Sequence, residues 1–185
     1  RGLGFTIDLL GEATITEAEA DHVQKQYLAL LTGLTAEVNH WPDVPVIDRD
    51  DRGSIPRVNV SVKLSAISAH VSALSFDGTV AELVETVLPV MRAAAAATPH
   101  KFVNFDMEEY RDLALTTAVF RGVLEHPDLH CLSAGIVLQA YLPDSHAVSE
   151  ELGEWAARRV ASGGAPIKVR IVRSEEHTSE LQSLR

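Results

Sequence analysis

The sequence predicts an α/β fold: the first five strand–helix units of a distorted TIM-type (βα) barrel, which is incomplete within this chain. Short β-branched apolar segments alternate with helix-like segments along the 185 residues. Five of the apolar segments end in a polar or charged residue, although strands of a parallel sheet are normally apolar almost throughout. Because barrels of this type build their active site at the C-terminal strand ends, the five polar ends indicate one shared site.

The five predicted strands share an apolar run and a polar residue near the downstream end. They are GFTID ending at Asp8, VNVSVK at Lys63, KFVNFD at Asp106, GIVLQ at Gln139 and PIKVR at Arg170. The second strand is expected to reach about Leu64, and the fifth to continue to about Val172. Parallel strands need right-handed helical crossovers, which the segments between them supply.

The helix-like segments follow in order. Thr16 and Glu19 form a capping-box pattern, and apolar residues near a 3.6-residue period extend that helix to about residue 38. The Asp- and Pro-rich segment 41–57 predicts an ordered surface excursion. Further helices are expected at about 80–97, 111–124 and 145–160, the last ending before a Gly-Gly turn at 163–164.

A five-stranded doubly wound sheet would give the same alternation of elements. A dinucleotide-binding fold of that class normally has a glycine fingerprint after its first strand, whereas LLGEAT contains a single glycine. A doubly wound sheet also uses chiefly the strand ends beside its switch point. Polar ends on every strand therefore favour the barrel.

Composition narrows the function classes. The formal net charge is −10, which argues against nucleic acid as a partner because a basic patch would be expected. A single cysteine excludes an intramolecular disulfide and fits a reducing, cytoplasmic compartment. No apolar run approaches the length of about 20 residues that spans a bilayer.

The last twelve residues depart from the pattern. After Arg173 the chain reads SEEHTSELQSLR, which has no apolar period, and RSEEHTSELQS matches the translation of a common sequencing-adapter oligonucleotide. We therefore expect a partial barrel at residues 1–173 and a non-native, adapter-derived tail at 174–185.

The strand ends combine carboxylates, two cations and one amide. Charges at a barrel mouth must pair with each other or meet a charged ligand, so Lys63 and Asp106 are expected to pair across neighbouring strands. The planar donors of Arg170 suit a carboxylate or the heteroatom edge of a flat ring. Gln139 both donates and accepts, which suits the imide edge of a flavin.

Two other functions fit these residues. A divalent-metal-dependent barrel lyase or hydrolase would use oxygen ligands from Asp8, Glu12, Asp106 and Glu108. The interleaved cations Lys63 and Arg170 count against it. A non-catalytic barrel fragment, in which the charges form structural ion pairs, is the third possibility.

The motifs FTIDLLGEATIT, NVSVKLSAI, NFDMEEYRD, GIVLQAYLPDS and IKVRIV occur in this order between residues 4 and 173. Together they resemble successive strand motifs of proline dehydrogenase, in particular the FAD-dependent domain of bifunctional bacterial proline-catabolic enzymes. The resemblance implies oxidation of L-proline to 1-pyrroline-5-carboxylate by hydride transfer to flavin N5. It also implies electron transfer to a membrane quinone, a peripheral membrane association and a fused aldehyde dehydrogenase domain in the parent enzyme.

The resemblance implies a role for each matching residue. Arg170 corresponds to an arginine near flavin N5, Gln139 to a glutamine at the flavin pyrimidine edge, and Met107 to a position where the backbone approaches the isoalloxazine. Lys63 corresponds to a lysine that neutralises the substrate carboxylate, and Asp106 to an acid that supports the proline pocket.

Two further acids belong to the same comparison. Asp8 and Glu12 correspond to acids that hold the substrate site together, with Glu12 orienting a substrate-binding arginine that this chain lacks. The late strands of the family, and a final helix with paired arginines, are also missing. We therefore expect the fragment to oxidise proline weakly or not at all.

Overall fold

The described part of the chain forms a parallel sheet with its helices gathered in one layer. The computed structural model describes residues 4–9, 13–51, 53–69 and 75–173. Five strands make the main sheet: β1 (Ile7–Asp8), β4 (Asn59–Val62), β5 (Phe102–Phe105), β6 (Gly135–Gln139) and β7 (Lys168–Val172).

The strands lie side by side in the order of the sequence, β1-β4-β5-β6-β7, and every neighbouring pair is parallel. A doubly wound sheet would reverse its order at a switch point. This sheet shows no reversal, so the order agrees with five successive strands of a barrel.

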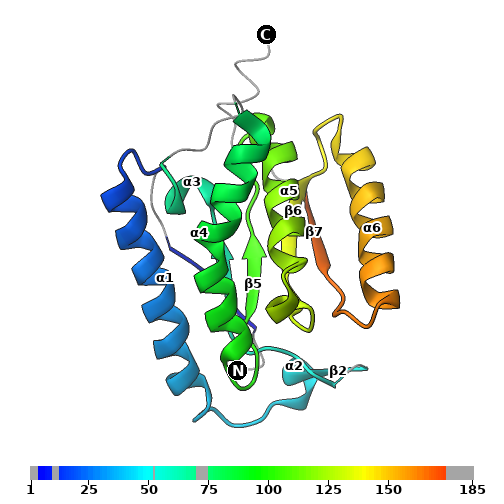
Figure 1. Ribbon diagram of the computed structural model, residues 1–185. Helices are drawn as coiled ribbons and strands as arrows, with labels where there is room; N and C mark the ends of the chain where they lie inside the picture. The colour runs from blue at the N-terminus through cyan, green and yellow to red at the C-terminus, as the bar shows by residue number, and fades with distance from the viewer. Residues whose placement is uncertain (1–3, 10–12, 52, 70–74, 174–185) are drawn as a thin grey trace.

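The long helices lie on one side of the sheet. They are α1 (Glu17–Val38), α4 (Phe76–Ala96), α5 (Leu113–Leu124) and α6 (Ser145–Ala161), and Figure 1 shows them in one layer in front of the strands. Helices on a single face are expected for barrel units, since the other face of the strands belongs to the barrel interior. Shorter helical turns complete the described fold: α2 (Pro45–Asp48), α3 (Leu64–Ile67), η2 (Tyr110–Asp112) and η3 (Pro127–Leu129).

The hydrophobic core fills the space between the sheet and the helices. Val60, Val62 and Phe105 of the central strands are fully buried within it. Phe105 makes an edge-to-face contact with Phe120 of α5, and their ring centroids are 5.3 Å apart. Trp155 of α6 packs in turn against Phe120. The helix-facing residues of each strand are therefore apolar.

Alternate residues of the same strands face the opposite side, and several of them are polar. Asp8, Ser61 and Asn104 stand in register across β1, β4 and β5. Side chains alternate between faces along a strand, so Lys63 and Asp106 continue this polar face two residues further on. The face of the sheet that points away from the helices thus carries the charged and hydrogen-bonding side chains.

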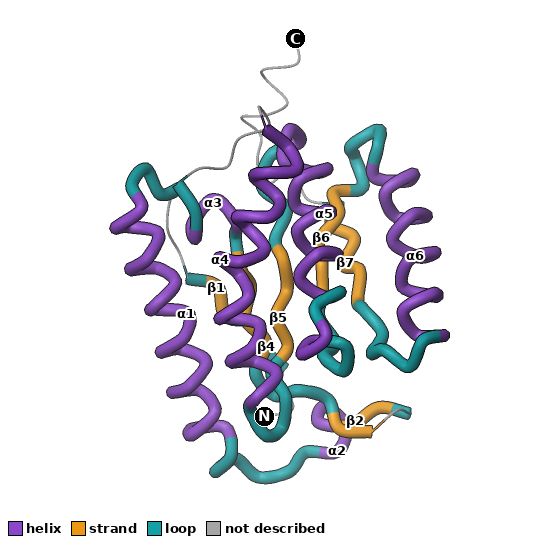
Figure 2. The backbone as a smooth tube through the Cα atoms, in the orientation of Figure 1, coloured by secondary structure: helices purple, strands orange, loops and turns teal. Residues whose placement is uncertain are grey.

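The excursion predicted at 41–57 is ordered. It contains α2 and a small antiparallel pair, β2 (Arg49–Asp50) and β3 (Gly53–Ser54), which lie near the N-terminal ends of the strands (Figure 2). Arg57 holds the excursion through ion pairs with Asp43 and Asp48. No helix in the described residues is long and apolar enough to cross a membrane.

Candidate active site

Four of the sequence-predicted residues meet at the C-terminal edge of the sheet. Asp8 ends β1, Lys63 follows β4, Asp106 follows β5 and Gln139 ends β6. Because all the strands are parallel, these ends lie along one edge. The common mouth predicted from the sequence is therefore present in the fold.

Lys63 pairs with Asp8 and not with Asp106, which corrects the pairing expected from the sequence. The Lys63 Nζ lies 2.9 Å from Asp8 Oδ2. Burial alone would lower the pKa of Lys63, but the hydrogen bond and charge of Asp8, together with the charges of Glu108 and Asp106, raise it above its ordinary value. Lys63 is consequently a protonated cation at the mouth.

Asp106 receives three donors, all on the same carboxylate oxygen. Asn104 Nδ2 donates to Oδ1 at 2.8 Å, Arg170 Nη2 at 3.0 Å and Ser61 Oγ at 3.2 Å. Burial raises the pKa of Asp106, while the charge of Arg170 and the hydrogen bonds of Ser61 and Asn104 oppose that rise.

Arg170 reaches this site from within β7, not from the strand end. It stands opposite Val137, and β7 continues to Val172 opposite Gln139. Its ion pair with Asp106 leaves the Arg170 side chain 47% exposed. No other partner within the described residues takes up its remaining N–H groups, so they are available to a ligand.

Gln139 is buried, with one half of its amide satisfied. Its Nε2 donates to the backbone oxygen of Glu108 at 3.3 Å, whereas Oε1 is buried and has no hydrogen-bond partner among the described residues. A buried carbonyl oxygen without a donor is costly, so this atom calls for a ligand N–H. The imide N–H of a flavin has that chemistry.

The remaining predicted residues have different surroundings. Met107 is 6% exposed and its side chain belongs to the hydrophobic core. Glu108 accepts a short hydrogen bond from Ser65 Oγ. Glu12 lies outside the described residues.

The metal hypothesis finds no support in the carboxylates that the structure describes. Asp8 and Asp106 each accept a cationic partner, and Glu108 turns toward Ser65. Within residues 4–9, 13–51, 53–69 and 75–173, no three His, Cys, Asp or Glu side chains gather as a metal site would require.

Three residues of the site were missed in the sequence. Ser61 and Asn104 both donate to Asp106, and each lies two residues before a polar strand end. That alternation was the available signal. Tyr27 of α1 is fully buried, and burial together with the charge of Asp8 raises the pKa of its phenol.

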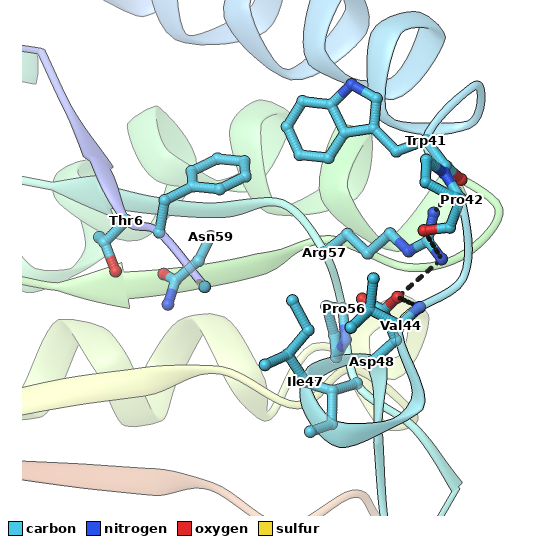
Figure 3. A pocket seen from close by; sticks show the side chains of 12 residues that line it. Thr6, Trp41, Pro42, Val44, Ile47, Asp48, Pro56, Arg57 and Asn59 are labelled. Carbon is cyan, nitrogen blue, oxygen red and sulfur yellow. Dashed lines mark hydrogen bonds and ion pairs between the residues drawn. The ribbon is translucent and has the colours of Figure 1, made fainter. Parts of the chain in front are cut away.

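A cavity of about 570 Å³ lies away from this site, at the N-terminal ends of the strands. Figure 3 shows it between Thr6 and Asn59 on one side and Trp41, Ile47 and Arg57 on the other. These residues precede β1, begin β4 or belong to the surface excursion. The cavity is therefore separate from the C-terminal edge of the sheet. We regard that edge as the site because the charged side chains and the unpartnered Oε1 of Gln139 lie along it.

Comparison with known proteins gives one family. The family described as proline dehydrogenase matches residues 1–183. No curated protein matches the chain.

Solved structures of proline utilization A (PutA) are similar in fold and sequence. The structure from Bdellovibrio bacteriovorus, described as inactivated by N-propargylglycine, is 37% identical with a TM-score of 0.89 and covers 97% of this chain. The structure from Corynebacterium freiburgense is 35% identical with a TM-score of 0.80 and covers 98%. The match spans only 18% and 17% of those two proteins, respectively.

Proposed function

Because the chain belongs to the proline dehydrogenase family, we propose that it forms part of the active site of an FAD-dependent enzyme that oxidises L-proline to 1-pyrroline-5-carboxylate. The observation that carries this proposal is the meeting of Lys63, Asp106 and Arg170 with the unpartnered oxygen of Gln139 at one sheet edge. Cations suit a substrate carboxylate, and an amide with a free acceptor suits a flavin imide.

The two cations have separate tasks. Lys63, held protonated by Asp8, neutralises the carboxylate of proline and fixes the ring at the mouth. Arg170, anchored on Asp106, directs its remaining donors to the region of flavin N5. A positive charge there favours the electron-rich reduced ring, which tunes the reduction potential.

The unpartnered Oε1 of Gln139 supports the cofactor contacts expected from the sequence. When bound, FAD supplies the acceptor at N5 for the hydride that leaves the proline carbon next to the nitrogen. Gln139 would hold the pyrimidine edge through Oε1, and the backbone at Met107 would face the ring. Asp8, Asp106 and Glu12 would support the proline pocket as acids.

The longer enzyme would supply what this chain does not. We propose that further strands, an arginine-bearing helix and a fused aldehyde dehydrogenase domain belong to the parent protein, which passes electrons to a membrane quinone at the cytoplasmic surface. The chain alone is then expected to turn over proline weakly or not at all.

Flavin binding and turnover test the proposal separately. The purified chain is titrated with FAD while flavin fluorescence and protein absorbance are followed, and proline-dependent dye reduction is then measured. We expect measurable flavin binding that Arg170→Met weakens about tenfold, equivalent to about 1.4 kcal/mol. The exposed Arg158→Met on α6 serves as the control. Equal FAD affinity in both variants would contradict the role of Arg170.

We also propose that residues 174–185 derive from an adapter, although the family match runs to residue 183. Re-sequencing the locus across codon 173 decides this. A natural reading frame that continues with SEEHTSELQS would show the tail to be native.

A further inference from the structure

Buried polar side chains of β4 and β5 are connected to Arg170 through Asp106. Asn104 lies in the middle of β5 and is 4% exposed, and Ser61 lies beside it on β4 and is 2% exposed. Both donate to Asp106 Oδ1, which also receives Arg170 Nη2. No donor within the described residues reaches the other oxygen, Oδ2.

The fold makes room for this line at one specific glycine. Gly135 of β6 stands opposite Asn104 in the register. A Cβ at Gly135 would lie 2.5 Å from Asn104 Oδ1 and 2.9 Å from the Phe102 ring. Any larger residue at position 135 would displace the Asn104 side chain. The absence of a side chain at Gly135 therefore leaves the space that the Asn104 amide occupies.

Two buried neutral donors on one oxygen have a clear physical effect. They fix the rotation of the carboxyl group, because three bonds to Oδ1 leave one orientation in which all are satisfied. They also favour the ionised carboxylate against the cost of burial. Because the Asp106 carboxylate then has one position and stays ionised, it determines where the paired guanidinium of Arg170 can lie.

We propose that Asn104 and Ser61 are positioning residues: they hold Asp106, and through Asp106 they set the placement of Arg170 toward the flavin. This inference rests on the proposed function for the identity of the ligand at Arg170, but its first half concerns the protein alone. Neither residue touches the reacting atoms. Gly135 belongs to the same arrangement because it seats Asn104.

The test uses the flavin-free chain. The carboxyl carbon of Asp106 is followed by NMR through a pH titration, with Asp106→Asn to assign the signal. Asn104→Leu, close to isosteric, removes one donor and is expected to raise the pKa of Asp106. Asn59→Leu is the matched control, since Asn59 lies on the same face of β4 but does not contact Asp106.

Ser61→Ala repeats the test with a smaller change, in case Asn104→Leu does not fold. We expect the Asp106 pKa to rise in Ser61→Ala as well, and to stay unchanged in Asn59→Leu. A loss of thermal stability without a change in this pKa would show Asn104 and Ser61 to be packing residues only, and would overturn the inference.

The second half is tested by FAD affinity. Asn104→Leu is expected to weaken FAD binding several-fold, in the same direction as Arg170→Met, while Asn59→Leu leaves it unchanged. A raised Asp106 pKa with unchanged FAD affinity would overturn the link to Arg170. If the unaltered chain binds no FAD, the proposed function fails for this chain, while the NMR titration still decides whether Asn104 and Ser61 hold Asp106.

Discussion

At the scale of single residues, Asp106 keeps a charge in a place that disfavours it. Its side chain is 15% exposed, and burial raises its pKa more than Arg170, Ser61 and Asn104 lower it. The pKa of Asp106 is therefore higher in the folded chain than in the unfolded chain, where an aspartate has a pKa of about 4. Stability falls as the pH rises between the two pKa values, and the cost remains at neutral pH.

We predict that Asp106→Asn raises the free energy of unfolding at pH 7. The asparagine keeps an oxygen for the three donors while it removes the charge. At about pH 3, where the aspartate is protonated in both states, the gain should vanish. Urea unfolding at both pH values measures this. A gain of equal size at both would show that packing, and not ionisation, is responsible.

Lys63 and Asp8 form the second pair to be tested. A double-mutant cycle with Lys63→Met and Asp8→Asn is expected to give a coupling energy of about 1 kcal/mol at pH 7. The pKa of Lys63 is raised above 10.5, so Lys63 is fully charged at pH 7, and the coupling is lost as the pH rises through the folded pKa of Lys63. A coupling near zero at pH 7 would contradict the pair.

The residues at the strand ends could be predicted from the sequence, but their partners could not. Polar ends on apolar strands identified Lys63, Asp106 and Gln139. The choice of Asp8 over Asp106 by Lys63 depends on side-chain reach and on the register between strands. Arg170 was found by its motif, and its position two residues before the end of β7 agrees with the predicted strand end near Val172.

At the scale of elements, Arg159 joins α6 to the segment between α5 and β6. Its guanidinium is buried, with the residue 7% exposed, and it lies over the Trp155 ring at 5.9 Å. Five backbone oxygens accept its hydrogen bonds, those of Leu124, Leu129, His130, Leu132 and Ala165. A single side chain therefore satisfies backbone oxygens at the end of α5, in the connection to β6 and after α6.

Arg159→Met should cost about 3 kcal/mol of unfolding free energy, because several buried carbonyls lose their donor at once. The neighbouring Arg158 is the matched control. It is exposed on α6 and lies 3.9 Å from Glu154, so Arg158→Met should change stability by less than about 0.5 kcal/mol. Urea denaturation of both variants gives the comparison. Equal losses would mean that the buried hydrogen bonds contribute nothing specific.

Local signals located the helices and fixed one of their starts. The capping box of Thr16 and Glu19 is present, and α1 ends at Val38 as expected. The fourth helix begins at Phe76, before the expected start near residue 80, because Asp77 and Gly78 lie within its first turn. The second strand ends at Val62 because Leu64–Ile67 forms a helical turn, and a segment of four residues is too short to show a helical period in the sequence.

At the scale of the whole molecule, the sheet has two edges. Within the described strands, β1 pairs only with β4 and β7 only with β6. Ile171 on β7 is 57% exposed. An exposed apolar edge strand is a template for pairing with another chain.

Ile171→Lys is accordingly expected to reduce self-association of the chain about tenfold or more, since a charge on an edge strand opposes edge-to-edge pairing. Val160→Lys, on the exposed surface of α6, supplies a control of similar exposure. Sedimentation velocity at several concentrations measures the effect. If both variants associate alike, the edge of β7 is not the contact.

The architecture was predictable because it rests on the order and type of elements. Alternating strands and helices with polar strand ends gave a barrel, and the sequential strand order with helices on one face agrees with it (Figure 1). The cavity beside Trp41 and Arg57 was not anticipated. It depends on how the excursion at 41–57 folds back, for which the sequence carries only turn signals.

The strict alternation between the two faces of each strand has a practical consequence for protein engineering. Positions 59 and 137 on the face opposite the helices can be randomised in a combinatorial library to alter selectivity, while the intervening valines and phenylalanines are kept, together with Ser61 and Asn104, which hold Asp106. One face of each such strand packs against the helices, and the other face is directed to the candidate site. Libraries confined to positions on the face opposite the helices should retain far more folded members than libraries of equal size that also vary the core face.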